Sequence, residues 1–150
     1  MLREEKSLKI GIMTVLFNDW KLEKVLKYVS GLGYEAVELA TWKGANHIDI
    51  EKILKGGATE YKKTIEKYGL IISGLSNHLE GQLVLGPLDA STDDWFKGTP
   101  EEKVKYGTER MKKTAEAAAA LDVPVVNGFI GAPNWGAWYI FPPAFEKMYE

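Results

Sequence analysis

Apolar residues recur along this chain in two alternating patterns. The first is a short run rich in Ile, Val and Leu, which is typical of a buried strand. Such runs occupy 7–15, 36–40, 70–76 and 123–129. The second is a three- to four-residue repeat with charged residues on the opposite side, which is typical of an amphipathic helix. Helices are therefore predicted between the runs, at 22–32, 59–68 and 99–121, and a last helix is predicted to start within 143–150.

Residues at the predicted helix ends agree with these boundaries. Thr99 and Glu102 have the spacing of a capping box at the start of the third helix. Gly33 stands where the first helix is expected to end. Asn18 or Asp19 is predicted to cap the start of that first helix, because short polar side chains accept hydrogen bonds from its free amides.

Strands that alternate with amphipathic helices predict an α/β fold with parallel strands and right-handed crossovers. An open doubly wound sheet and a (β/α)8 barrel both have this order. No Gly-x-Gly-x-x-Gly follows the first strand, because Gly31 and Gly33 lie at a helix end, and this favours the barrel. A barrel has eight units and about 250 residues. We therefore expect residues 1–150 to form one N-terminal half of a TIM-barrel domain, the first four β/α units with outer helices, truncated in the helix after strand four.

Composition excludes several classes of site and partner. The 150 residues are 45% hydrophobic and 27% charged and include no cysteine, so disulfides and thiolate metal ligands are excluded. No apolar run is long enough to cross a bilayer and the charged start does not resemble an export signal, so we expect a cytoplasmic protein. The net charge of −2 gives no field that attracts nucleic acid or a membrane. The helical lysines are interpreted as solvent-facing: 62, 63, 67, 103, 105, 112 and 113.

The loops that follow the predicted strands collect polar and aromatic residues, whereas the turns that precede the strands are minimal. In a parallel barrel the functional face lies at the carboxyl ends of the strands. His47 and His78 both lie in these loops. Each is a candidate metal ligand or proton carrier, and the alternative for each is a hydrogen-bonded structural histidine.

Acidic and aromatic residues add further candidates. Glu38 lies on a predicted buried strand, where it either orients a ligand or forms a salt bridge within the barrel. Trp135 and its aromatic neighbours either stack on a sugar or pack locally. The acidic residues of the long third loop either touch a cation or serve as turn and solvated residues: Glu80, Asp89, Asp93 and Asp94.

Four segments together resemble the N-terminal half of the sugar phosphate isomerase/epimerase family. They read KIGIMTVLFND, GYEAVELATWKGANHIDIEKIL, GLIISGLSNHLEGQLVLGP and NWGAWYIFPPAFE. The more specific parts are GANHID at 44–49, Ser76-Asn77-His78, and Asn134-Trp135. The resemblance implies a xylose isomerase-like barrel, with the second type of AP endonuclease as a more distant relative.

The family resemblance also implies a chemistry. Its members are divalent-metal enzymes, using Mn, Mg or Zn, that move a proton between neighbouring carbons of an aldose or ketose through an enediolate. The resemblance implies that His78 contacts the substrate or a secondary metal. Further residues are expected to line the same pocket: His47, Glu38, Asn46, Asn134 and Trp135.

The catalytic residues of the family lie on strands five to eight, so we expect the 150-residue chain to be inactive alone. It would expose the inner side of its sheet and two strand edges. We therefore expect a homodimer or association with a complementary half-barrel. The alternatives are a non-catalytic carbohydrate-binding half-barrel and an abasic-site endonuclease relative, although the acidic balance disfavours the latter.

Overall fold

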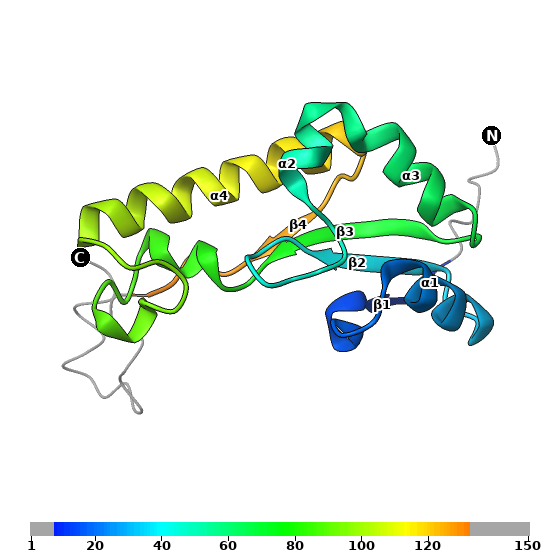
Figure 1. The fold of residues 1–150 in the computed structure, drawn as a ribbon, viewed down its shortest axis with the longest axis horizontal. Helices are drawn as coiled ribbons and strands as arrows, with labels where there is room; N and C mark the ends of the chain where they lie inside the picture. The colour runs from blue at the N-terminus through cyan, green and yellow to red at the C-terminus, as the bar shows by residue number, and fades with distance from the viewer. Residues whose placement is uncertain (1–7, 133–150) are drawn as a thin grey trace, which may run out of the picture.

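The computed structural model describes residues 8–132, which form a four-stranded parallel sheet with helices on its outside (Figure 1). The strands are β1 (Gly11–Met13), β2 (Ala36–Ala40), β3 (Ile71–Asn77) and β4 (Val126–Gly128). They lie in the order β1-β2-β3-β4. A doubly wound sheet reverses its strand order at a switch point, whereas a barrel adds each strand beside the last. The predicted α/β fold is therefore confirmed, in the strand order of a barrel.

Three longer helices follow the strands. They are α1 (Leu22–Gly31), α3 (Ala58–Glu66) and α4 (Pro100–Ala120). The short helix α2 (Ile50–Lys52) continues through a π turn at Ile53–Gly57 into α3. Shorter 3-10 turns lie at Thr14–Phe17, Glu80–Val84 and Ala90–Thr92.

All these helices cover one face of the sheet. Val37 and Leu39 point to the same side of β2, because side chains alternate along a strand. Val37 packs with α1 and α3, and Leu39 packs with the α2 segment and α4. Figure 1 shows α2, α3 and α4 along one side of β3 and β4, with α1 beside β1 and β2. Among the residues that the structure describes, no helix packs against the opposite face of the sheet, although Ala36, Ala40 and Ser76 on that face are buried.

The predicted capping box at the start of α4 is confirmed. Thr99 Oγ1 accepts a hydrogen bond from the Glu102 backbone amide at 3.3 Å. Glu102 Oε2 accepts one from the Thr99 backbone amide at 2.8 Å. At the other end of α4, Ala117 and Ala118 are buried against the sheet, where their small side chains allow close approach.

Three details differ from the sequence predictions. Lys21 is the N-cap of α1 without a side-chain cap bond, and Asn18 instead binds the loop after β2. The first and fourth strands cover three residues each and not 7–15 and 123–129, because pairing with the neighbouring strand is confined to Gly11–Met13 in β1 and to Val126–Gly128 in β4. The short helix and π turn at 50–57 replace a predicted loop. Asn134, Trp135 and the helical start within 143–150 lie outside the described residues.

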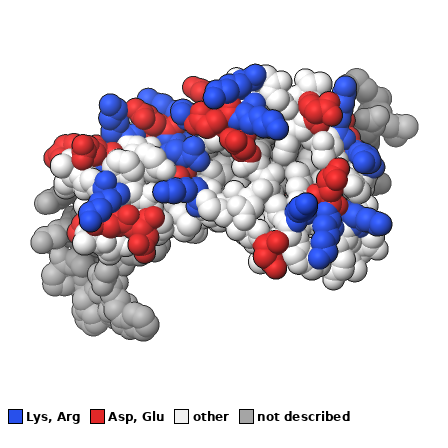
Figure 2. Space-filling view, viewed as in Figure 1, with Lys and Arg blue, Asp and Glu red and all other residues white. Residues whose placement is uncertain are grey.

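Charged residues of both signs are mixed over the helices, with uncharged surface between them (Figure 2). Lys103 is an exception, since its side chain is only 1% exposed and pairs with Asp93. Its interpretation as solvent-facing is wrong, because α4 turns this position onto the loop that follows β3. No helix within 8–132 has the length and apolar character that crossing a membrane requires.

Candidate functional site

The open face of the sheet presents its side chains in layers. Ala40, Ser76 and Asn127 are register neighbours on β2, β3 and β4. Glu38 and Gly74 are partners one layer nearer the amino ends of the strands. Because side chains alternate along each strand, these positions face the open side. Glu38, Ser76 and Asn127 are therefore the polar side chains of two adjacent layers of this face.

An aromatic layer of Trp42, His78 and Phe129 follows at the carboxyl ends of the same strands. The His78 ring stacks on Trp42 with centroids 5.5 Å apart and on Phe129 with centroids 4.9 Å apart, both at 29°. Since both faces of the imidazole are covered, only its nitrogen-bearing edge can bind another group. The structure therefore presents His78 as a hydrogen-bonding or metal-binding edge and not as a stacking surface.

Glu38 is tied to a neutral partner. Asn127 Nδ2 donates to Glu38 Oε2 at 2.8 Å. The bond passes over Gly74, where a Cβ atom would lie 3.6 Å from that nitrogen. Within residues 8–132, Glu38 makes no ion pair, so the alternative of a salt bridge within the barrel has no partner in the described part. The second carboxylate oxygen and the Asn127 carbonyl oxygen remain available to a ligand.

The backbone next to His78 is fixed by a buried carboxylate, Glu80, which is 2% exposed. Glu80 accepts hydrogen bonds from the Tyr106 hydroxyl at 2.6 Å and from Arg110 Nε at 2.7 Å. It also accepts from Asn77 Nδ2 at 3.0 Å and from the Lys43 backbone amide at 3.3 Å. Four donors occupy this carboxylate, so Glu80 serves to hold α4 against the strand ends and not to bind a cation.

Tyr106 and Arg110 come from α4 and were not identified by the sequence analysis. Burial, followed by the hydrogen bond to Glu80, raises the pKa of Tyr106 to about 12. Arg110 also donates to the Thr41 backbone oxygen at 2.7 Å and lies 3.8 Å from Glu51. One helix therefore fixes the ends of β2 and β3 together.

Asn46 and His47 lie in a clasp between the loops after β1 and β2. Asn46 Nδ2 donates to the Asn18 backbone oxygen at 2.9 Å, and Asn18 Nδ2 donates to the Gly44 backbone oxygen at 2.8 Å. His47 is 5% exposed and its Nε2 lies 3.0 Å from the Trp20 backbone oxygen. The structure thus brings His78 and Glu38 onto one face but uses Asn46 and His47 within the loops. Substrate contact by the latter two stays a prediction.

The divalent metal implied by the family resemblance requires a set of converging ligands. In the described part of the chain, no group of three His, Asp or Glu side chains is arranged to hold a metal ion. Asp93 of the predicted acidic loop is 2.7 Å from Lys103 Nζ. The described residues do not by themselves fit a metal centre, since His78 and the Glu38 carboxylate are two ligand candidates on the open face and a third is not found beside them.

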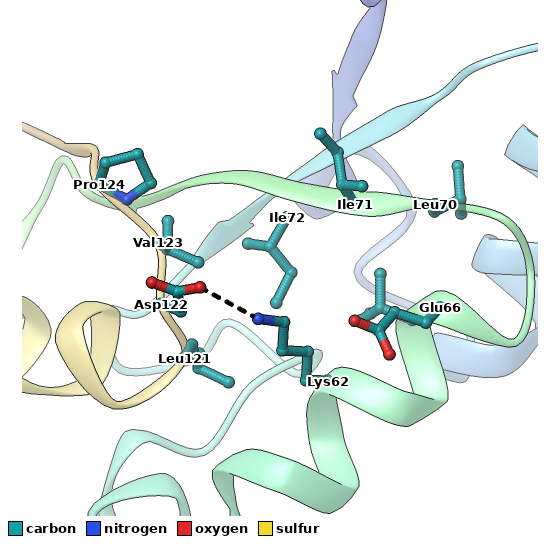
Figure 3. Close-up of a pocket in the computed structure, with 10 residues that line it drawn as sticks. Lys62, Glu66, Leu70, Ile71, Ile72, Leu121, Asp122, Val123 and Pro124 are labelled. Carbon is teal, nitrogen blue, oxygen red and sulfur yellow. Dashed lines mark hydrogen bonds and ion pairs between the residues drawn. The ribbon is translucent and has the colours of Figure 1, made fainter.

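An apolar groove of about 270 Å³ lies at the opposite end of the sheet (Figure 3). Ile71 and Ile72 at the start of β3 line it together with Val123 and Pro124 before β4. Lys62 and Asp122 face each other across it at 3.5 Å. This end of a TIM barrel serves stability, so the groove is not the candidate site.

Comparisons with known proteins agree with this layout. A family model described as a xylose isomerase-like TIM barrel matches residues 26–148. A solved chain from Rhodospirillum rubrum ATCC 11170, provisionally named a xylose isomerase, aligns with a TM-score of 0.56 and 22% identity. The alignment covers 95% of this chain and 46% of that chain, so this chain spans about half the length of that relative. At this identity the likeness shows the fold alone. The sequence has no match among curated proteins.

Proposed function

The chain belongs to the xylose isomerase-like TIM barrel family, and we propose that it forms part of a divalent-metal-dependent isomerase or epimerase of sugars or sugar phosphates. The observation that carries the proposal is the layered open face. His78 is held edge-on between Trp42 and Phe129, above the hydrogen-bonded pair of Glu38 and Asn127. These groups lie at the carboxyl ends of parallel strands, where TIM-barrel enzymes bind their substrates.

Each group has a proposed task in binding a sugar. The nitrogen edge of His78 binds a substrate oxygen or serves as one ligand of a metal. Glu38 accepts a hydrogen bond from a sugar hydroxyl. The aromatic layer packs against the C–H faces of the sugar and excludes water. Asn134 and Trp135 remain proposed contacts from outside the described residues.

The reaction proposed is proton transfer between neighbouring carbons of an aldose or ketose through an enediolate. A general base must lie within hydrogen-bond reach of the proton that it removes. The bound metal, Mn, Mg or Zn, would supply charge stabilisation. The acid–base groups are expected on strands beyond β4, so activity requires a completed barrel.

Solvent deuterium incorporation tests the proposal. Aldoses and ketoses are incubated in D2O with Mn2+, Mg2+ or Zn2+, and exchange at the carbon next to the carbonyl is followed by NMR. We expect exchange from the fraction in which the barrel is complete. His78→Gln should lower the exchange rate at least about tenfold. Losing one interaction worth about 1.4 kcal/mol in the transition state slows a reaction tenfold. Lys62→Gln, at the opposite end of the sheet, is the control and should leave the rate unchanged.

One result would contradict an isomerase or epimerase, and a second would contradict the place of His78 in its site. Saturable sugar binding by a complete barrel without any deuterium exchange and without any interconversion of aldose and ketose would identify a carbohydrate-binding module instead. Exchange that is equally fast in His78→Gln would remove His78 from the site.

A further inference from the structure

Ser76 carries a buried hydroxyl group without a partner. The residue is 0% exposed, and its Oγ atom makes no hydrogen bond among the residues described. An unsatisfied buried polar atom costs about 1–3 kcal/mol, so native proteins pair such groups with water or a ligand. Ser76 lies in register with Asn127 and therefore faces the same side as the pair of Asn127 and Glu38.

The charge of this face selects against a phosphate. On the open face of the described strands, Glu38 is the single charged side chain. Its neighbours on that face are small or uncharged, among them Ala36, Ala40, Gly74, Ser76 and Asn127. Phosphate sites use Arg, Lys or clusters of backbone amides. Arg110 is already held on the helix side by Glu80 and the Thr41 backbone oxygen. The Glu38 carboxylate would repel a phosphate dianion.

The same groups match neutral hydroxyls well. The second oxygen of Glu38 and the carbonyl oxygen of Asn127 are acceptors, and the Ser76 hydroxyl is both donor and acceptor. A sugar hydroxyl likewise donates one bond and accepts others. Because Ser76 Oγ is buried, a ligand reaches it only by displacing part of the side chains that cover it.

We propose that Glu38, Ser76 and Asn127 form a hydroxyl subsite, one layer below His78, that binds the neutral polyol part of the substrate and rejects a phosphate group. The inference rests on the proposed function, since it assigns a part of the same site. It adds that any phosphate on the substrate points away from these three residues.

Sorbitol and sorbitol 6-phosphate test the subsite directly. Neither has a carbonyl group to isomerise, so their binding is measured by calorimetry with EDTA present, independently of metal and turnover. We expect the full chain to bind sorbitol at least about fivefold more tightly than its 6-phosphate, which corresponds to about 1 kcal/mol. Ser76→Ala should weaken sorbitol binding by about five- to tenfold through loss of one hydrogen bond. Glu38→Gln should reduce the ratio of sorbitol affinity to sorbitol 6-phosphate affinity, because it removes the charge that repels the phosphate.

Ser73→Ala is the matched control, because Ser73 is an exposed serine on the same strand. It should bind both polyols as the unmodified chain does, and circular dichroism confirms that each variant is folded. Equal or tighter binding of sorbitol 6-phosphate would overturn the subsite. So would unchanged sorbitol binding in Ser76→Ala and Glu38→Gln, or no sorbitol binding at millimolar concentrations.

The outcomes separate this inference from the proposed function. Sorbitol binding that depends on Ser76, without deuterium exchange into any sugar, would overturn the isomerase and keep the subsite. Deuterium exchange that does not change in Ser76→Ala, with sorbitol binding also unchanged, would overturn the subsite and keep the isomerase.

Discussion

Glu80 illustrates how single residues hold the candidate site in place. Its carboxylate is buried beside His78 and is satisfied by four donors, two of which come from α4. Burying a charge is costly unless it is paired and hydrogen-bonded. The network therefore makes the position of the β3 end depend on Arg110 and Tyr106, which lie on a helix 26 to 30 residues away in the sequence.

Replacing Arg110 by Met should destabilise the chain strongly. The variant leaves Glu80 as a buried carboxylate without its cation, and we expect the free energy of unfolding in urea to fall by about 3–5 kcal/mol. Lys113→Met is the matched control, because Lys113 also binds Glu51 from α4 but is 42% exposed. Its loss should be below about 1 kcal/mol. Equal losses in the two variants would contradict a buried network.

Tyr106 predicts a loss of stability at alkaline pH. Its pKa is about 12 in the folded chain and about 10 in an unfolded chain, because burial and the bond to Glu80 disfavour the phenolate. The unfolded form therefore releases the proton first, and stability present below pH 10 is lost as the pH rises toward 12. Unfolding free energies measured between pH 9 and pH 12 should fall more steeply for the unmodified chain than for Tyr106→Phe. Tyr28→Phe, at an exposed position, is the control, and identical slopes in all three would contradict the assignment.

Sequence reasoning found His78 and Glu38 but not the residues that contact them. The bond between Glu38 and Asn127 joins positions 89 apart, and it depends on the register of three strands. The alternation of positions 38, 40 and 42 is visible in the sequence, but one sequence does not fix which residues become neighbours across strands. For His47, the structural alternative matches the observed contact with the Trp20 backbone.

At the scale of elements, the second half of the loop between β3 and α4 is anchored by two residues of α4, Lys103 and Tyr106. Lys103 Nζ donates to Asp93 Oδ1 at 2.7 Å, to Thr92 Oγ1 at 3.0 Å and to the Asp89 backbone oxygen. Phe96 stacks on Tyr106 with ring centroids 4.4 Å apart. The carboxylate of Asp93 in this loop thus pairs with Lys103, a cation of the protein itself.

Lys103→Met should release this loop. The substitution leaves the Asp93 carboxylate and the Thr92 hydroxyl without their donor. We expect limited proteolysis within residues 85–98 to become about tenfold faster or more. The free energy needed to open the loop should fall by about 1.4 kcal/mol or more, which raises the open population tenfold. Lys105→Met removes an exposed lysine from the same helix and should leave the cleavage rate unchanged. An unchanged rate in Lys103→Met would show that the stack of Phe96 on Tyr106 holds the loop alone.

Long periodic elements were predicted better than short ones. The bounds of β2 and α4 agree with the sequence, because apolar runs and a capping box define them locally. The helix and π turn at 50–57 were missed, since Gly56 and Gly57 indicate a loop unless packing of Ile50 and Ile53 against α4 is known. Asn18 has the residue type of an N-cap but is used by the clasp to Gly44 and Asn46.

At the scale of the whole molecule, the helices cover one face of the sheet and the other carries the candidate site. Apolar side chains remain exposed on or near this open face, among them Val125 at 42% and Phe129 at 52%. The outer strands β1 and β4 each have one neighbour in the described sheet. Unpaired strand edges beside exposed apolar surface favour association.

We propose that two copies of the chain associate about a two-fold axis, with β4 of each copy beside β1 of the other. Eight parallel strands would then close a barrel, and both open faces would become its interior. Sedimentation velocity should give twice the monomer mass of 16.8 kDa.

Matched lysine substitutions decide whether the open face is the surface that associates. Val125→Lys places a charge directly before β4, on the same side of the sheet as Asn127, where a closed barrel would bury it, so this variant should sediment as a monomer. Leu32→Lys changes an apolar residue of similar exposure, 59%, at the end of α1 on the helix side, and it should still associate. A soluble monomer of the unmodified chain at all concentrations would contradict the pairing. Equal association of both variants would place the interface elsewhere, and sugar exchange would then have to come from an incomplete barrel.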